Sequence, residues 1–435
     1  MSHLATVSEV RLTRFKTFRD AVLPLEPLTV LIGRNSSGKS NALDGLDVLS
    51  RLAWGEDVRG ALDGRHRDIG AVRGGLEGCP PHGSDIFELG CTVDTPWGAP
   101  AMLDVAVRVR PDVRIISEQL SGRMRDGQPM LLRSLAPESG GGSIVITKYA
   151  DRPEPTYRVS SKGDRLFCSQ MSSGFFSEVA REGDMIEAAE VLLDALRGVF
   201  HLDPVPHLMR QYVPARDAEL RRSAENLSAA VGGIARRAPE EFAQLEAALR
   251  RIAEHPIEHL RTTRSDLDDV MLVVDEGQGG ITPAREMSDG MLRFLAIATA
   301  LITGRHGVDI YAGPSVKPSL TLVVEELENG LHPSQANLLL DLLHQAVARE
   351  RTQVLVTTHS PALLSALSGD DHRGVIVCDR ESGAGLSRLQ RLPEIDGYAA
   401  AMAEGRLGDV VARGRLPLRP EERDYSDFDR LMGIG

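Results

Sequence analysis

The octapeptide GRNSSGKS, residues 33–40, has the spacing G-x-x-x-x-G-K-S, which is typical of a loop that binds phosphate. Its glycines allow successive backbone N–H groups to converge on one anion, and a helix beginning near Lys39 would add its positive end. Lys39 would reach the outer phosphates, and the Ser40 hydroxyl would bind Mg²⁺. Because an apolar run precedes the loop and a helix-like segment follows it, the context favours a P-loop over a polar turn that matches by chance.

Two adjacent carboxylates, Glu325 and Glu326, end the apolar segment TLVVEE. Such a pair is unfavourable unless a cation or a proton relieves the repulsion, and beside a P-loop that cation would be Mg²⁺. In this interpretation Glu325 helps to hold Mg²⁺, whereas Glu326 accepts a proton from the water that attacks the γ-phosphate. The alternative is a pair of exposed acids that begins a turn.

A histidine, His359, follows the next predicted strand, QVLVTT. An imidazole at this position could donate a hydrogen bond to the γ-phosphate and so sense the nucleotide. A lone histidine is more often structural. Here its place at the carboxyl end of a parallel strand favours a function, because parallel sheets gather their chemistry at that edge.

The segment SDGMLRF, residues 288–294, predicts a capped helix that could also bind an anion. Ser288 is a typical N-cap, Asp289 suits the positive end of a helix, and Gly290 permits close approach of another group. The simple interpretation is a well-capped helix. The functional one is a second anion cradle. One phosphate rarely needs two cradles, so two copies of the chain would face each other, each closing on the ATP held by the other.

Composition and charge are those of an ordinary globular protein. The 435 residues suggest two or three domains, and a net charge of −12 argues against broad electrostatic adhesion to nucleic acid. Arginine-rich stretches at 108–133 and 210–264 are interpreted as structural, with local DNA contact left open for the first. Scattered cysteines, no apolar run of about 18 residues and no leader pattern lead us to expect a cytoplasmic protein with no membrane span.

Hydrophobic patterns predict the elements that must position these residues. Strands are expected in 7–33, near 86–94, across 101–165, and at 270–275, 319–326, 353–358 and 374–379. Helices are expected at 184–200, 240–255, 288–302 and 333–350. The alternation in 101–165 indicates antiparallel strands, whereas strands alternating with helices indicate an α/β protein whose sheet is mostly parallel and covered on both faces. A flexible turn is expected at 139–143 and a mobile acidic tail at 420–429.

The order of the motifs GRNSSGKS, SDGMLR, VVEELENGLHP and TTHSP resembles the RecF/SMC branch of the ABC-type ATPases. More closely, the chain is similar to bacterial AAA-type ATP-binding proteins related to the ATPase part of the OLD family. The opening RLTRFKTF and the segments AENLSAAV and GRLGDVV also resemble stand-alone members of that family. The likeness spans nearly the whole chain, and only the middle is loosely matched.

This resemblance implies a P-loop NTPase of the ABC ATPase-head type, with an antiparallel β subdomain, a helical insertion, and ATP and Mg²⁺ as cofactors. It assigns catalysis to Glu326 and His359, and metal binding to Ser40 and Glu325. Nucleotide binding falls to the P-loop and the signature, which comprise Gly33, Arg34, Asn35, Ser36, Ser37, Gly38, Lys39, Ser40, Asn41, Ser288, Asp289 and Gly290. The D-loop would be Asn329 to His332, and Arg14, Lys16 and Phe18 would lie near the nucleotide.

The chain departs from the family pattern at two places in this site. Most ABC proteins have Asp at the position of Glu325. No Q-loop glutamine is recognisable between Ser40 and Ser288, where Arg73 is a candidate for that place. OLD nucleases also carry a C-terminal Toprim domain, and the residues that follow His359 are too few for one. We therefore expect a stand-alone ATPase head.

The sequence thus predicts an ATPase head in three parts: 1–105 with the P-loop, 106–275 as a β/helical insertion, and 276–435 with the signature and the carboxylate pair. It would form a homodimer around ATP, with a larger oligomer left open, and drive a conformational switch in a DNA-repair or anti-phage defence complex with a separate nuclease or toxin effector. The alternative is an ATP-dependent scaffold with negligible turnover. A P-loop kinase fits poorly, because it gives SDGMLR and His359 no role.

Overall fold

The computed structural model describes most of the chain. The described residues are 5–64, 70–125, 127, 129–135, 143–149, 157–160, 163–173, 183–310, 319–349, 352–381, 383 and 385–414. The turn expected at 139–143, apart from its last residue, and the acidic tail expected at 420–429 lie outside them.

One mixed sheet of 14 strands organises the described residues. Its strands in spatial order are β10 (Val199–Leu202), β15 (Leu320–Val324), β16 (Thr352–Thr357), β3 (Leu28–Gly33), β17 (Val375–Arg380), β18 (Ser387–Arg391), β2 (Phe18–Pro24), β1 (Thr6–Phe15), β4 (Ile86–Asp94), β5 (Pro100–Arg108), β6 (Arg114–Arg123), β7 (Pro129–Leu135), β8 (Ser143–Tyr149) and β9 (Tyr157–Ser160). The first five are parallel, and most pairs beyond β17 are antiparallel. The α/β class is confirmed, but the antiparallel strands extend the same sheet, so the sheet is mixed and not mostly parallel.

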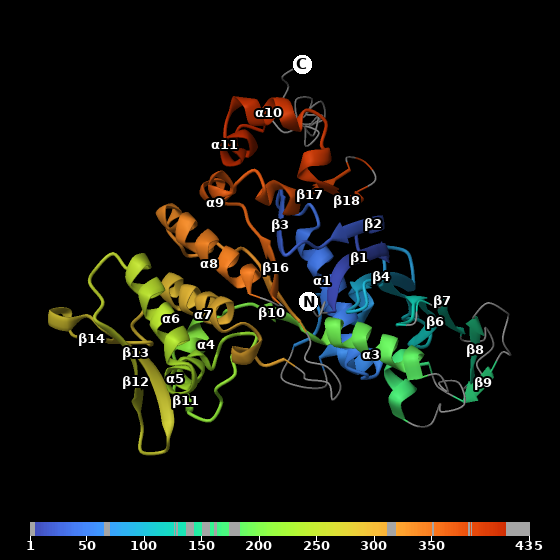
Figure 1. Ribbon diagram of the computed structural model, residues 1–435, viewed down its shortest axis with the longest axis horizontal. Helices are drawn as coiled ribbons and strands as arrows, with labels where there is room; N and C mark the ends of the chain where they lie inside the picture. Colours follow the sequence, from blue (N-terminus) through green and yellow to red (C-terminus); the bar gives the residue numbers. More distant parts are fainter. Residues whose placement is uncertain are drawn as a thin grey trace, which may run out of the picture.

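A smaller sheet and a set of helices complete the architecture (Figure 1). The small antiparallel sheet contains β11 (Val213–Pro214), β13 (Asp269–Asp275), β12 (His259–Arg264) and β14 (Ile281–Pro283). The helices are α1 (Lys39–Ala53), α2 (Val58–Asp63), α3 (Gly183–Arg197), α4 (Pro206–Met209), α5 (Leu227–Arg237), α6 (Pro239–Ile252), α7 (Asp289–Thr303), α8 (Ala336–Ala348), α9 (Pro361–Ala366), α10 (Tyr398–Glu404) and α11 (Leu407–Ala412).

The parallel strands are buried on both faces. Leu31 of β3 belongs to a hydrophobic core with α1 and α3, whereas Val30 and Ile32 belong to a second core with α7 and α8. Figure 1 shows α1 and α8 on opposite sides of β3 and β16. Because side chains alternate along a strand, a strand covered on both faces must be apolar throughout. This explains the unbroken apolar run before the P-loop.

Two predicted helices are too long at their ends, and the one over 240–255 stops at Ile252. The helix expected over 184–200 ends at Arg197, and Val199–Leu202 forms β10, which runs parallel to β15 at the edge of the sheet. Four residues are too few to show an alternating pattern, so the apolar VF pair reads as a continuation of the helix. The strand predicted at 86–94 is confirmed as β4, and α2 was not predicted.

The arginine-rich stretches form ion pairs within the chain. Arg108 pairs with Asp112 at 2.6 Å and Arg110 with Glu77 at 2.6 Å, both in the first stretch. Ion pairs in the second stretch join Arg221 to Asp217, Arg251 to Asp341, Arg261 to Asp275 and Arg264 to Asp268. These contacts support the structural interpretation of both stretches.

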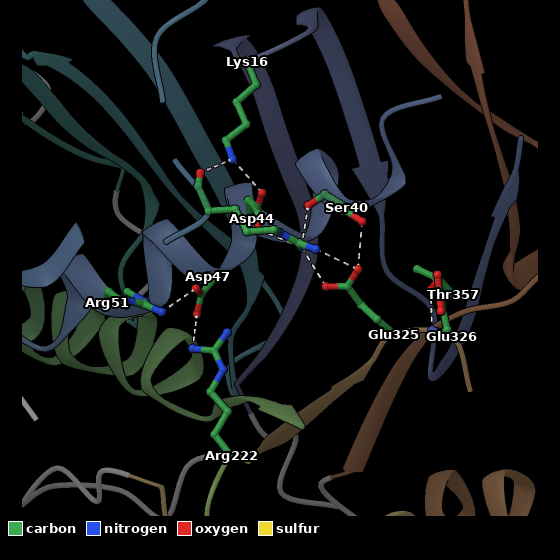
Figure 2. Close-up of polar contacts among 10 residues, drawn as sticks. Lys16, Ser40, Asp44, Asp47, Arg51, Arg222, Glu325, Glu326 and Thr357 are labelled. Atoms are coloured by element: carbon green, nitrogen blue, oxygen red, sulfur yellow. Dashed lines mark hydrogen bonds and ion pairs between the residues drawn. The ribbon is translucent and has the colours of Figure 1, made fainter. Parts of the chain in front are cut away.

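Strand β10 brings a buried histidine beside α1. His201 is 8% exposed, and its charge neighbours are Asp47, Arg222, Glu325 and Arg51. Burial lowers the pKa of His201 to about 4, although Asp47 acts in the opposite direction. Asp47 itself forms ion pairs with Arg51 at 3.0 Å and with Arg222 at 3.1 Å (Figure 2). The imidazole is therefore neutral in the folded protein at physiological pH.

His201 should make folding sensitive to acid. An unfolded histidine titrates near pH 6.5 and the folded one near pH 4, so the unfolded chain binds more protons between these values. The free energy of unfolding therefore rises with pH across this window, by up to about 3 kcal/mol. We expect His201→Gln to flatten that dependence, as measured by urea denaturation at several pH values. The control is His207→Gln, an exposed position on α4, and equal slopes in the wild type and His201→Gln would contradict the assignment.

Candidate functional site

The P-loop lies between β3 and α1, where the sequence predicts it. Gly33 and Gly38 have φ values of 154° and 115°. A Cβ on Gly33 would lie 2.2 Å from the carbonyl oxygen of Cys378, and one on Gly38 would lie 2.3 Å from the hydroxyl of Ser387. The neighbouring strands β17 and β18 therefore press against the loop, and only glycine fits at both positions.

The lysine of the P-loop is bonded to the backbone of the loop itself. Lys39 Nζ donates hydrogen bonds to the carbonyl oxygens of Gly33 and Arg34, each at 2.9 Å. Burial lowers the pKa of Lys39, against the opposing charge of residues that include Glu326. The buried hydroxyl of Ser37 has no hydrogen-bond partner among the described residues. The loop thus offers a cation and an unsatisfied donor to an incoming anion, and its residues fit a nucleotide phosphate.

The last P-loop serine faces the first glutamate of the carboxylate pair. Ser40 Oγ donates a hydrogen bond of 2.8 Å to Glu325 Oε2 (Figure 2). Burial would raise the pKa of Glu325, but the hydrogen bond and charge of Arg73 and the Ser40 hydroxyl together hold it below its usual range. An ionised carboxylate beside a hydroxyl is an oxygen-ligand pair of the kind that Mg²⁺ prefers, so these two residues fit the metal.

Arg73 is the other direct partner of Glu325. Its guanidinium contacts both oxygens of Glu325, at 2.7 and 3.1 Å, and donates to the carbonyl oxygen of Ser40 at 3.2 Å. Its Nε donates to Asp44 at 2.9 Å, and Asp44 also pairs with Lys16 at 2.7 Å. Arg73 therefore lies against the expected metal ligands, and it is the residue that the sequence offers for the place of the Q-loop glutamine.

Glu326 has an unusual backbone conformation. Its φ is 48°, which is uncommon for a residue other than glycine and is maintained only where surrounding contacts enforce it. The backbone N–H of Glu326 donates to the hydroxyl of Thr357 at 2.8 Å (Figure 2), and the amide of Asn329 lies 3.5 Å from its carboxylate. The end of β16 thus holds the backbone of Glu326, while its carboxylate stays exposed at the edge of the sheet.

His359 lies close enough to the P-loop to respond to its charge. Partial burial lowers the pKa of His359, and the positive charge of Lys39 lowers it further. Its backbone N–H donates to Glu328, which follows the carboxylate pair. The imidazole is therefore neutral at physiological pH and can donate one N–H.

The signature segment begins α7 as predicted. The Ser288 hydroxyl accepts a hydrogen bond from the backbone N–H of Met291 at 3.2 Å, which confirms the N-cap. A Cβ on Gly290 would lie 1.9 Å from the carbonyl oxygen of Gly330, so the signature packs against the loop that follows β15 in the same chain. Within the described residues, no hydrogen bond or ion pair joins 288–290 to 33–40. Asp289 instead pairs with Arg210 at 2.6 Å.

Only some of the remaining predicted site residues lie close to the P-loop. The ring of Phe18 lies beside Gly38, and Asn41 donates to the Thr17 hydroxyl at 2.9 Å. Arg34, Asn35 and Ser36 are exposed on the loop. Arg14 pairs with Glu88 of β4 at 3.2 Å and does not reach the P-loop.

Sequence reasoning missed Asp44 and Thr357. Asp44 is buried on α1, one helical turn after Ser40, and that spacing was the available signal. Thr357 lies two residues before His359, but nothing in its type or spacing indicates that it holds the backbone of Glu326.

The P-loop lies between a strand and a helix, and an acidic pair ends a nearby parallel strand. A capped helix packs against the loop that follows this pair. Together these features define a P-loop ATPase domain of the ABC type. Residues 28–97 and 187–365, more than half of the chain, match the family model described as "AAA domain, putative AbiEii toxin, Type IV TA system". The chain belongs to this family.

Solved structures of SMC head domains are also similar to this chain. One is the SMC head bound to the C-winged helix domain of ScpA, at 14% identity and a TM-score of 0.44, covering 88% of this chain and 97% of that one. The SMC head domain from Thermotoga maritima is 13% identical, with a TM-score of 0.39, and the match covers 89% of this chain and 98% of that one. A third is the SMC head with an extended coiled coil, bound to the C-terminal domain of ScpA derived from Pyrococcus furiosus. It is 12% identical, with a TM-score of 0.46, and the match covers 92% of this chain and 99% of that one. No curated protein matches the chain.

We expect Gly290→Ala to destabilise the protein, because the new methyl group would collide with the backbone at Gly330. Overpacking costs about 1–3 kcal/mol, which exceeds the gain of up to about 1 kcal/mol from the better helix former. The measurement is the free energy of unfolding in urea. Gly70→Ala is the matched control, since a Cβ there has nothing within 4 Å. Equal stability of the two variants would show that the contact between α7 and Gly330 is loose.

Proposed function

We propose that this protein binds ATP with Mg²⁺, dimerises around two ATP molecules and hydrolyses them to drive a conformational switch. The observation that carries the proposal is the 2.8 Å hydrogen bond between Ser40 of the P-loop and Glu325 at the end of β15. It joins two motifs that are 285 residues apart, which supports a metal site shared by these two residues.

Each site residue then has a defined task. Lys39 would leave the carbonyl oxygens of its own loop and pair with the outer phosphates, while Ser40 and Glu325 would hold Mg²⁺. When bound, the metal would neutralise charge that develops on the β- and γ-phosphates. The exposed carboxylate of Glu326 would accept a proton from the attacking water. A neutral His359 would donate a hydrogen bond to the γ-phosphate, which is consistent with its closeness to Lys39.

The position of the signature supports a dimer. The N-terminus of α7 packs against Gly330 of its own chain, and no described contact joins it to its own P-loop. Its backbone N–H groups and positive end would instead close on ATP held by a second copy. Nucleotide binding would then stabilise the closed dimer, and hydrolysis would release it, because ATP contributes contacts that exist only in that state.

The biological setting we propose is an anti-phage defence or DNA-repair complex whose effector is a separate nuclease or toxin. The description of the family, which names a toxin of a Type IV toxin–antitoxin system, supports the defence setting. None of the described helices is long and apolar enough to span a membrane. We propose a cytoplasmic location, with DNA as a candidate ligand, and a relation to the OLD family stays a prediction.

We expect Glu326→Gln to bind ATP normally but to hydrolyse it about 10²–10⁴-fold more slowly, because the general base is lost. The uncleaved nucleotide should then trap the dimer. Nucleotide affinity, phosphate release, and sedimentation velocity with ATP and Mg²⁺ measure the three effects. Lys39→Ala is the control that should remain monomeric, since it lacks the cation for the phosphates. Normal turnover in Glu326→Gln would remove Glu326 from the mechanism.

A scaffold that uses ATP only as an occupancy signal makes a different prediction for the wild type. Its phosphate release would stay near the uncatalysed rate with or without DNA, although ATP would still change its assembly state. We expect measurable turnover. A wild type that dimerises with ATP and never releases phosphate would favour the scaffold.

A further inference from the structure

Arg73 contacts Glu325, the residue that is proposed to bind the metal. We propose that Arg73 is the resident counter-cation of Glu325 and that metal loading displaces it, so that Arg73 sets the metal concentration at which the site fills. The inference rests on the proposed function, because it assumes that Glu325 is a metal ligand. It adds a positioning residue that works by competition.

The contacts of Glu325 leave little room for a second cation. Both of its oxygens accept hydrogen bonds from the Arg73 guanidinium, at 2.7 and 3.1 Å, and Oε2 also accepts one from Ser40 at 2.8 Å. A planar guanidinium matches a carboxylate with two parallel bonds and is always charged. A divalent ion on the same carboxylate would face this positive charge at close range, so the two cations compete for Glu325.

Arg73 can release Glu325 without losing all of its partners. Its Nε is bonded to Asp44 at 2.9 Å, which is independent of Glu325, and Asp44 is also neutralised by Lys16 at 2.7 Å (Figure 2). Lys16 further donates to the carbonyl oxygen of Arg73 at 2.8 Å, which fixes the backbone while the guanidinium turns. Displacement therefore costs the ion pair with Glu325 and the hydrogen bond from Arg73 to the carbonyl oxygen of Ser40.

The structure also offers the displaced guanidinium a place to go. Arg73 and Glu325 line a cavity of about 840 Å³ that extends along α1 toward β10. Asp47, Asp203 and Glu225 line the same cavity together with Arg51, Arg197, Arg221 and Arg222, so its walls carry both carboxylates and guanidinium groups. The Arg73 side chain is 49% exposed, and in the proposal its displaced guanidinium would turn toward this space.

The test is direct Mn²⁺ binding to the nucleotide-free full chain, with Mn²⁺ as the probe for Mg²⁺ and the loss of its free-ion EPR signal as the readout. We expect Arg73→Gln to lower the half-saturating Mn²⁺ concentration about two- to fivefold, the size of one half-exposed ion pair. Arg73→Lys keeps the charge without the two parallel bonds and should give an intermediate value. The control is Arg110→Gln, which removes an exposed ion pair with Glu77 and should change nothing.

Other outcomes overturn the proposal. An unchanged half-saturation in Arg73→Gln would mean that Arg73 does not compete, and a higher value would mean that it helps Glu325 to bind the metal. Adding Glu325→Gln to Arg73→Gln should abolish the tighter Mn²⁺ binding. If the tighter binding persisted, the Mn²⁺ would be bound elsewhere. If Arg73→Gln does not fold, Arg73→Lys decides, because the proposal requires it to bind Mn²⁺ more tightly than the wild type. Nucleotide affinity is measured separately, in EDTA. If the protein bound no nucleotide, the proposed function would fail, but the Mn²⁺ competition between Arg73 and Glu325 would still stand or fall on its own measurement.

Discussion

Charge compensation at Glu325 is the constraint on which the rest of the site depends. This carboxylate ends a buried parallel strand, and burial alone would favour its neutral form. It stays ionised because Ser40 and Arg73 approach it from α1 and from the loop before β4. The fold must therefore bring three distant segments together within hydrogen-bonding distance. The two hydrophobic cores on either face of β3 and β15 provide the rigidity that this arrangement requires.

Features that depend on local chemistry were predictable from the sequence. The P-loop spacing, the N-cap at Ser288 and the carboxylate pair each need only a short stretch of chain, because backbone geometry and capping are set by neighbouring residues. The start of α1 at Lys39 and the strand at 86–94 were found for the same reason. The three-part division of the chain stays a prediction.

Features that depend on distant contacts could not be predicted in the same way. β10 is only four residues long, and its register with β15 is decided by tertiary packing across more than a hundred residues. The sequence indicated that Arg73 was a candidate near the site, but not that it would hold both oxygens of Glu325. Likewise, nothing in the type of Thr357 shows that its hydroxyl fixes the positive φ of Glu326.

The contact between Gly290 and Gly330 links the proposed dimer to the proposed chemistry. Gly330 follows Glu326 by four residues, so the same short loop touches the signature helix and carries the proposed base. A second copy that pushed on the N-terminus of α7 would press on this loop. Glu326 already has an uncommon positive φ, and its backbone is held by hydrogen bonds to the Thr357 hydroxyl and to the N–H of Asn329, so a displacement of this loop would change the direction of its carboxylate. In the proposed dimer, contact of a second copy with the signature would therefore reach the loop that carries Glu326.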